Sequence, residues 1–149
     1  MHPPPLAPLL VPPAHRRPFE LRAPRDTLAP KLMRNWISVL LSVTGHQKYI
    51  DDAQLIVAEL VTNVVRHTRA PRVDLEVVVE PTFVRGSVWD NSPQWPCVRK
   101  AGPEEGGGRG LCLVAALASD WGVFRTGPRG PLRKGVWFVL DDGSGMSTQ

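Results

Sequence analysis

Hydrophobic and polar positions alternate, or recur at helical spacing, in successive stretches of the chain, and these patterns predict the order of its secondary structure. Residues 19–22 alternate apolar and charged side chains, which predicts a short strand. Apolar residues then recur every three or four positions as far as Val43, which predicts an amphipathic helix capped by Asp26 or Thr27. A second stripe of the same spacing over 51–67 predicts a second helix.

The middle of the chain predicts a β-hairpin followed by a long loop. Residues 73–80 alternate apolar and polar side chains, the proline and threonine at 81–82 supply a tight turn, and 83–90 are expected to return as the partner strand of the hairpin. Residues 91–107 are rich in proline, glycine, serine and charge, so we expect a surface loop. A loop of this length is more often a functional lid than a passive connection.

The last third of the chain predicts one more helix and two more strands. Residues 111–118 are nearly all apolar, which predicts a helix buried on several sides, and 121–125 and 135–140 have the composition of strands. The order strand, helix, helix, hairpin, loop, helix, hairpin predicts an α+β fold. In this fold about three helices pack on one face of a mainly antiparallel, mixed sheet, as a two-layer sandwich.

Length and composition indicate one folded domain with loose ends. The 149 residues suffice for a domain with its own core, and 42% apolar with 21% charged residues is typical of a globular protein. We expect a disordered, proline-rich arm over 1–17, the folded domain over 18–142 and a frayed tail over 143–149.

Charge and cysteine content narrow the class of function. The net charge of +4 suits a phosphate ligand or an acidic partner, but the basic residues are scattered and no DNA-binding motif accompanies them. Cys97 and Cys112 form no disulfide framework and have no metal-site spacing. The sequence shows neither a signal peptide nor an apolar run of about 20 residues. We therefore expect a cytoplasmic protein that binds no membrane and no nucleic acid directly.

Three short constellations carry candidate chemistry. The first lies on the second predicted helix, where Glu59, Asn63 and His67 follow one another at four-residue steps along the border of the apolar stripe. An amide oxygen is a suitable Mg²⁺ ligand beside phosphates, and a carboxylate one turn away could accept a proton from a hydroxyl nucleophile. A solvated helix edge, with Glu59 bonded to a neighbour such as Arg66, is the simpler alternative.

The second constellation is Asp90, which stands where a predicted strand meets the long loop. A carboxylate fixed at that point could accept a hydrogen bond from an exocyclic amine such as that of adenine. The alternative is an Asx-turn, in which Asp90 only bonds the next backbone amides.

The third constellation is a glycine-rich run at the start of the apolar helix, made of Gly107, Gly108, Arg109, Gly110 and Leu111. Glycines allow close backbone approach, and a helix N-terminus presents unsatisfied N–H groups to an anion, so the run could hold phosphates. It is not a P-loop, because no Gly-Lys-Ser/Thr follows. A flexible hinge is the alternative.

In their order and spacing, the three constellations resemble the N, G1 and G2 boxes of the GHKL (Bergerat-fold) ATP-binding superfamily. The chain is similar to the actinobacterial serine/threonine-kinase-like anti-sigma regulators, also through its later Trp121-Gly122 and Val136-Trp137-Phe138. The resemblance covers about residues 18–140. It implies a Bergerat-type α/β sandwich with ATP and Mg²⁺ as cofactors. It also implies a protein kinase that phosphorylates a serine of an anti-anti-sigma (STAS) partner, or a protein that sequesters a sigma factor.

The same resemblance implies a role for each site residue. Glu59 would be the base that deprotonates the serine, Asn63 would coordinate Mg²⁺, and Asp90 would bond the adenine amine. His67 and the run 107–111 would complete the nucleotide site, with the glycines wrapped around the phosphates. The partner is expected to be a protein, and a homodimer is one option for its assembly.

Two departures from the family pattern favour a second interpretation. Asn91-Ser92-Pro93 stands where the family commonly has glycines after its aspartate. Arg133-Lys134-Gly135 stands where it often has Gly-Lys-Thr, so that Gly135 replaces a threonine. A catalytically inactive interaction module of the same fold is therefore the alternative. A histidine-kinase catalytic domain is disfavoured, because no dimerisation helix with a phosphorylatable histidine precedes the domain.

Overall fold

The computed structural model of the chain describes residues 17–91, 107–126 and 133–143, with the backbone alone for 107–110. Nearly all of the arm, the long loop and the tail expected from the sequence lies outside these ranges. The described elements are β1 (Phe19–Pro24), α1 (Ala29–Val43), the 3-10 helix η2 (Gln47–Tyr49), α2 (Ile50–His67), β2 (Arg72–Glu80), β3 (Phe83–Asp90), α3 (Gly107–Leu117), β4 (Asp120–Arg125) and β5 (Lys134–Asp141).

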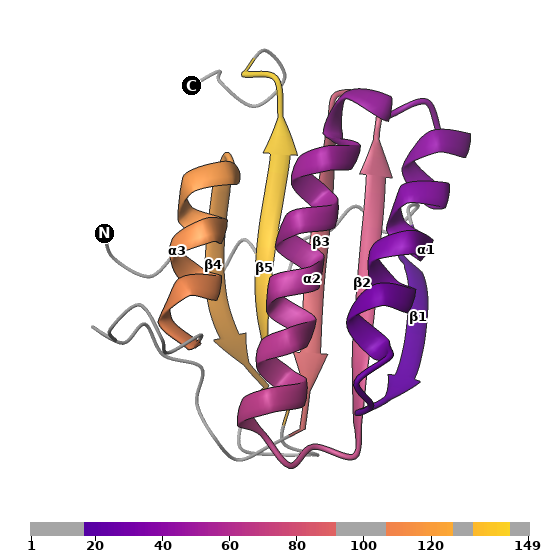
Figure 1. Ribbon diagram of the computed structural model, residues 1–149. Helices are drawn as coiled ribbons and strands as arrows, with labels where there is room; N and C mark the ends of the chain where they lie inside the picture. Colours follow the sequence, from indigo (N-terminus) through magenta and orange to yellow (C-terminus); the bar gives the residue numbers. More distant parts are fainter. Residues whose placement is uncertain (1–16, 92–106, 127–132, 144–149) are drawn as a thin grey trace.

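The strands form one sheet in the order β1-β2-β3-β5-β4. Figure 1 shows α1, α2 and α3 side by side on one face of this sheet, with α1 toward the β1 edge and α3 toward the β4 edge. The expected α+β architecture is therefore confirmed. All four ladders between the described strands are antiparallel, so the mixed sheet suggested by the sequence is not seen among them. None of the helices in the described ranges is long and apolar enough to cross a bilayer.

The start of α1 differs from the expectation. The helix begins at Ala29, not directly after Asp26 or Thr27, and its N-cap residue Leu28 makes no side-chain cap bond. Asp26 still shapes the entry to the helix, because its Oδ1 accepts a hydrogen bond from the Leu28 backbone N–H at 2.8 Å. The aspartate thus stabilises the turn before the helix, as Asx-turns do, and the helix starts later than the cap pattern predicted.

The expectation that the third helix is buried on several sides is wrong. In α3, Leu111 and Val114 are buried in the core, whereas Cys112, Ala115 and Ala116 are exposed. α3 lies at the outer side of the helix layer, beside α2 alone among the described helices (Figure 1). Its apolar composition is compatible with exposure because alanine has little surface to bury.

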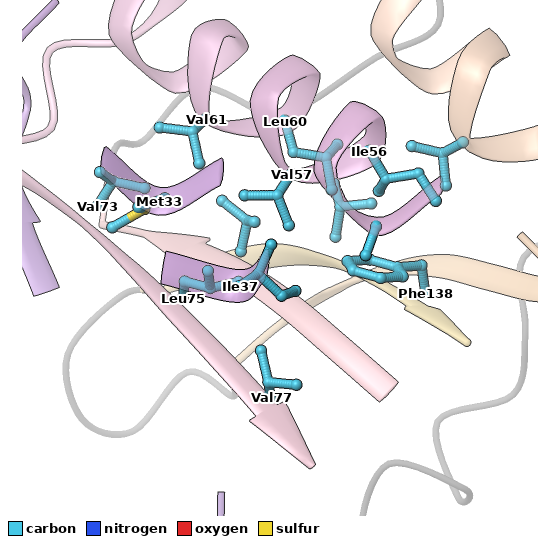
Figure 2. Close-up of a cluster of buried hydrophobic side chains, with 14 of the residues drawn as sticks. Met33, Ile37, Ile56, Val57, Leu60, Val61, Val73, Leu75, Val77 and Phe138 are labelled. Carbon is cyan, nitrogen blue, oxygen red and sulfur yellow. The ribbon is translucent and has the colours of Figure 1, made fainter. Parts of the chain in front are cut away.

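The core lies between the helix layer and the sheet. Figure 2 shows side chains of α1, α2, β2 and β5 that point from both layers into one interior: Met33, Ile37, Ile56, Val57, Leu60, Val61, Val73, Leu75, Val77 and Phe138. The helical residues recur at three and four positions and the strand residues at two, so each element turns one apolar face inward. Burying each of these side chains contributes roughly 1.5–3 kcal/mol.

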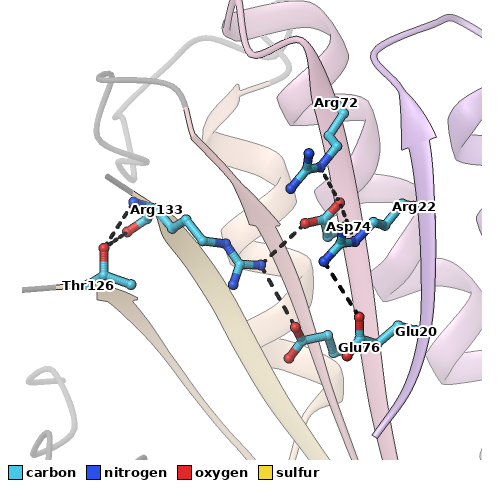
Figure 3. Close-up of polar contacts among 7 residues, drawn as sticks. All are labelled: Glu20, Arg22, Arg72, Asp74, Glu76, Thr126 and Arg133. Atoms are coloured by element: carbon cyan, nitrogen blue, oxygen red, sulfur yellow. Dashed lines mark hydrogen bonds and ion pairs between the residues drawn. The ribbon is translucent and has the colours of Figure 1, made fainter. Parts of the chain in front are cut away.

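The opposite face of the sheet carries a buried carboxylate surrounded by arginines (Figure 3). Asp74 of β2 is buried, with Arg72 Nε 3.0 Å from its Oδ1 and Arg133 Nη2 3.4 Å from its Oδ2. Arg22 of β1 approaches from the other side at 3.9 Å. These cations offset the cost of burying the charge. Burial also raises the pKa of the neighbouring Glu76, an effect that Arg133, at 3.8 Å, opposes.

An aromatic cluster occupies the β3–β5–β4 part of that same face. It consists of buried Phe124, Trp137 and Val139, with Phe83 and Trp89 packed against them. Trp89 stacks on Phe124 with ring centroids 4.1 Å apart, and the guanidinium carbon of Arg133 lies 4.2 Å from the Trp89 ring centroid. Stacking and the cation–π contact fix the Trp89 ring beside β5.

Gly86 of β3 lies directly against the Phe138 ring in the core, which leads to a stability prediction. A Cβ added at Gly86 would come within 2.7 Å of Phe138 Cε1, and Phe138 is fully buried, so its ring has little room to move. We expect Gly86→Ala to lower the free energy of unfolding by about 1–3 kcal/mol. Urea denaturation followed by tryptophan fluorescence measures this change.

Two further variants identify the cause of that loss. Ser87→Ala alters the next position, which points to the opposite face of the sheet, and should change stability by no more than about 0.5 kcal/mol. Combining Gly86→Ala with Phe138→Leu should cost less than the sum of the two single changes, because the smaller side chain leaves room for the new methyl group. Simple additivity would show that the collision is not the cause.

Candidate functional site

The first candidate group lies along one flank of α2. Glu59 and Asn63 are half-buried there, and His67 is exposed at the end of the helix. The opposite flank faces α1, since Gln54 Nε2 donates a hydrogen bond to the Arg34 carbonyl at 3.4 Å. Residues 59 and 63 are turned by about 140–180° from residue 54 around the helix, so they face the α3 side.

The side chains of Glu59, Asn63 and His67 make no hydrogen bond or ion pair with another described residue. The simpler alternative, in which Glu59 is bonded to Arg66, is therefore not seen in this part of the chain. Half-buried polar groups usually satisfy their hydrogen bonds with protein, water or ligand. A carboxylate and an amide one turn apart are therefore not used by the described part of the protein itself, and a ligand at this flank of α2 could bond to them.

The chain direction brings all three candidate groups to one end of the domain. α2 and β3 end at the lower end of Figure 1, and α3 and β5 begin there. The last turn of α2, Asp90 at the end of β3 and the first turn of α3 therefore lie at the same end, although they are far apart in sequence. Their roles in nucleotide binding stay predictions, but the fold permits them to act together.

Asp90 is buried and forms an ion pair with a lysine that the sequence analysis did not include among the site residues. Lys134, the first residue of β5, is 2% exposed, and its Nζ lies 2.6 Å from Asp90 Oδ1. The two residues are direct partners in the β3–β5 ladder, and both point to the helix side of the sheet. The carboxylate expected to bond adenine therefore already has a cation beside it.

Gly135 lies on the face of β5 that points away from Asp90. Its ladder partner is Trp89, and a Cβ built on it would lie 2.6 Å from Phe124 Cε1, within the aromatic cluster on the opposite face. The residue of β5 that lies opposite Asp90 is Lys134. A ligand that contacts Asp90 would therefore meet the side chain of the lysine and not position 135. The glycine is explained by the close approach of the Phe124 ring.

The glycine-rich run is part of α3 and does not precede it. The helix begins at Gly107, so 107–110 form its first turn, and Leu111 is buried in the core. The unsatisfied N–H groups of that turn are at the end of the domain shared with Asp90 (Figure 1). The backbone N–H groups expected to attract an anion therefore belong to the first turn of a regular helix and not to a loop before it.

The candidate residues at this end of the domain are of chemical types that can bind ATP together with Mg²⁺. Mg²⁺ usually retains waters and phosphate oxygens and takes only one or two protein ligands, so a single amide such as Asn63 is sufficient. Within the described ranges there is no group of three or more histidine, cysteine, aspartate or glutamate residues that could hold a metal alone. A cation here would depend on phosphate oxygens for most of its ligands.

Comparison with known proteins supports the resemblance derived from the sequence. None of the curated proteins matches the chain. The family model described as the histidine kinase-like ATPase domain matches residues 23–134, which is more than half of the 149 residues and contains every candidate site residue. The resemblance to the GHKL ATP-binding superfamily is thereby confirmed. The chain belongs to the histidine kinase-like ATPase domain family.

Proposed function

We propose that the chain binds Mg·ATP at the end of the domain shared by α2, β3 and α3. We further propose that it transfers the γ-phosphoryl group to a serine of a STAS-fold anti-anti-sigma partner, or sequesters a sigma factor, and so regulates transcription in the cytoplasm. One observation carries the proposal beyond family membership. Glu59 and Asn63 lie one helical turn apart on the α2 flank that faces α3, half-buried, and their side chains have no partner among the described residues.

Each residue then has one task. Asn63 holds Mg²⁺, which neutralises phosphate charge when bound. Glu59 accepts the proton of the serine hydroxyl. The serine oxygen bonds to the γ-phosphorus, and the bond between that phosphorus and the departing ADP breaks. The N–H groups of the first turn of α3 bind phosphate oxygens. The adjacency of Glu59 and Asn63 supports this division, because phosphoryl transfer depends mainly on positioning and charge stabilisation.

Asp90 and Lys134 provide a hydrogen-bond acceptor and a donor side by side on the base side of the site. Adenine carries an amine donor next to a ring-nitrogen acceptor, so the amine would donate to Asp90 and the ring nitrogen would accept from Lys134. Adenine must then compete for two groups that already bond each other, with Lys134 Nζ 2.6 Å from Asp90 Oδ1. We therefore propose that this site binds adenine more weakly than a site with a solvent-facing carboxylate would.

Asn63→Ala provides the direct test of nucleotide binding. We expect the affinity for Mg·ATP to fall about 10- to 100-fold, equivalent to roughly 1.4–2.7 kcal/mol, because the cation loses its protein ligand. The affinity for ATP in excess EDTA should change little, since that complex contains no Mg²⁺. Isothermal titration calorimetry of the full chain, with and without Mg²⁺, measures both values.

Gln54→Ala is the matched control, because it removes an amide from the α1-facing flank of the same helix. It should leave the affinity for Mg·ATP within about twofold of the unaltered chain. An equal loss in the two variants would contradict the site, because the effect would then follow from damage to α2. No detectable heat with the unaltered chain at millimolar ATP would contradict nucleotide binding itself.

A catalytically inactive interaction module is the second candidate. The ion pair between Lys134 and Asp90 favours it, because a carboxylate engaged by a buried cation is less free to bond a base. This candidate expects the same affinity for a sigma factor or STAS partner in the presence and absence of Mg·ATP. The kinase proposal instead expects partner binding to change with nucleotide, and a phosphorylated serine to appear on the STAS protein.

A further inference from the structure

The outer face of the sheet, opposite the helices, changes in character from one side to the other. On β1 and β2 it carries charged side chains, among them Arg72 and Glu76 (Figure 3). On β5 and β4 it carries the aromatic cluster, in which Trp137, Val139 and Phe124 are only 5%, 4% and 8% exposed. A sheet face in contact with water is normally polar. The charged part fits that rule, and the buried apolar part does not.

No described helix covers this apolar part of the outer face. α1, α2 and α3 all lie on the other face of the sheet (Figure 1). Val78 of β2 points to the outer face, because its neighbours Val77 and Val79 point into the core. It is 9% exposed, although it belongs neither to the core nor to the aromatic cluster. A contiguous apolar patch on a sheet face is typical of a surface that binds another segment.

Trp137 has a hydrogen-bond donor that the described residues leave unused. Its indole Nε1 is buried and has no acceptor among them. Buried polar groups normally have a partner, so an acceptor is expected beside this ring. The partners of Trp137 in the two ladders of β5 are Ser87 and Gly122. Because both residues are small, another segment can approach the Trp137 ring closely.

Residues 1–16, which lie outside the described ranges, have the composition that such a surface binds. They contain no acidic residue, and their prolines are Pro3, Pro4, Pro5, Pro8, Pro12 and Pro13. Proline favours the polyproline II conformation, whose carbonyl groups make no hydrogen bonds within the helix. Aromatic-lined surfaces bind segments of this kind. The unused N–H of Trp137 is a donor that suits one of those carbonyl groups.

The described chain begins at a place from which this segment can reach the aromatic cluster. Through the ladders, Phe19 at the start of β1 is in one row with Phe138 of β5, next to Trp137. Strands lie about 4.8 Å apart, which puts β5 about 14 Å and β4 about 19 Å from β1. A polyproline segment advances about 3.1 Å per residue, so about five residues reach β5 and about six reach β4. Counted back from residue 17, Pro12 and Pro13 then lie over β5.

We propose that residues 9–16 of the chain bind across the outer face of the sheet as an extended polyproline segment. Pro12 and Pro13 pack on the aromatic cluster, and Trp137 Nε1 donates to a backbone carbonyl of the segment. The proline-rich arm is then part of the folded domain, and it covers the apolar half of the outer face. This proposal is independent of the nucleotide site, because α2 and α3, which carry that site, lie on the other face (Figure 1).

Two proline pairs in the full chain provide the test. Pro12→Gly/Pro13→Gly removes the rings that pack on the cluster. Pro4→Gly/Pro5→Gly is the matched control, because at about 3.1 Å per residue this pair falls beyond β4. The measurement is hydrogen exchange of the Trp137 indole N–H in ¹⁵N-labelled protein, followed by NMR and assigned with Trp137→Phe. Exchange should become about tenfold faster or more in the first variant, because the cover opens more often, and should change less than about twofold in the control.

A nitroxide spin label at position 7 locates the segment directly. Ala7→Cys carries the label in a full chain that also contains Cys97→Ser and Cys112→Ser. The amide signals of β4 should broaden more strongly than those of β1, because position 7 lies beyond the β4 edge when 9–16 cross the sheet. A label on Ala14→Cys is the control. It stays about 9 Å from the start of β1 and should broaden β1 and β2 whether or not the arm crosses.

Four outcomes would overturn the proposal. Equal exchange rates in the two proline variants would show that the arm does not cover Trp137. Stronger broadening of β1 than of β4 by the label at position 7 would show that the arm does not cross the sheet. Broadening that disappears when the labelled ¹⁵N chain is diluted with unlabelled ¹⁴N chain would show that the arm covers a second copy. An unprotected Trp137 N–H in the unaltered chain would show that the surface is free for another protein.

Discussion

Replacing Glu59 with glutamine is expected to separate chemistry from binding. The amide has the size of the carboxylate but cannot accept the serine proton, so transfer of the γ-phosphoryl group should fall about 100- to 10,000-fold. Mg·ATP affinity should stay within about twofold, because Asn63 and the first turn of α3 are unchanged. Transfer from radiolabelled ATP to purified STAS-domain proteins measures the first quantity, and calorimetry the second.

Asp52→Asn is the control for Glu59→Gln. Asp52 is a half-buried carboxylate on the same flank of α2, two turns earlier, near the opposite end of the helix from the proposed phosphates. Its loss should leave transfer within about twofold, although the helix N-terminus loses a favourable charge worth roughly 0.3–1 kcal/mol of stability. Transfer that persists in Glu59→Gln would show that another group is the base. Transfer lost equally in both variants would indicate a general effect of charge on α2.

The spacing of apolar residues was sufficient to predict the buried faces of α2 and β2, but not that of α3, where a nearly continuous apolar run has no periodicity that marks one face. On α2 the recurrence every three and four residues placed Glu59 and Asn63 at the border of the buried arc, and the structure has them half-buried there. On β2 the alternation set Val73, Leu75, Val77 and Val79 apart from the charged residues between them, and all four are buried in the core. Periodicity is a local property of the backbone, so the sequence contains it directly.

The partner of Asp90 could not be predicted in this way, because it depends on the register between strands that are distant in the chain. Matching 133–135 to a family pattern assigned importance to Gly135, whereas the ladder pairs Asp90 with Lys134 and turns Gly135 to the other face. A shift of one residue exchanges the two faces of a strand, so an alignment that is right to within one position is still wrong about the site. A lysine at the start of an otherwise apolar strand was the available signal, since lysine is almost never fully buried unless it is paired.

Replacing that lysine is expected to produce the largest loss of stability in the domain. Lys134→Met keeps an unbranched side chain of most of the same length and volume but removes the charge, so the Asp90 carboxylate loses the ammonium that lies beside it. Removing one partner of a buried ion pair typically costs about 3–5 kcal/mol. That loss is comparable with the whole stability of many domains of this size. Urea denaturation at neutral pH, followed by tryptophan fluorescence, measures it.

The same substitution at an exposed ion pair is the control. Lys48 Nζ lies 2.9 Å from Asp142 Oδ2, a similar geometry, but the two side chains are 60% and 38% exposed. Lys48→Met should therefore cost far less stability than Lys134→Met, because water solvates the remaining carboxylate. An equally small cost for Lys134→Met would contradict the view that Asp90 depends on its cation.

A double variant separates the lost charge partner from lost packing. Asp90→Asn combined with Lys134→Met leaves no uncompensated charge in the buried position, so it should recover much of the stability lost by Lys134→Met alone. The double variant also distinguishes stability from binding. A folded domain that lacks both the carboxylate and the ammonium should bind ATP more weakly than the unaltered chain if these two groups contact the base. Unchanged affinity in that variant would show that the ion pair is purely structural.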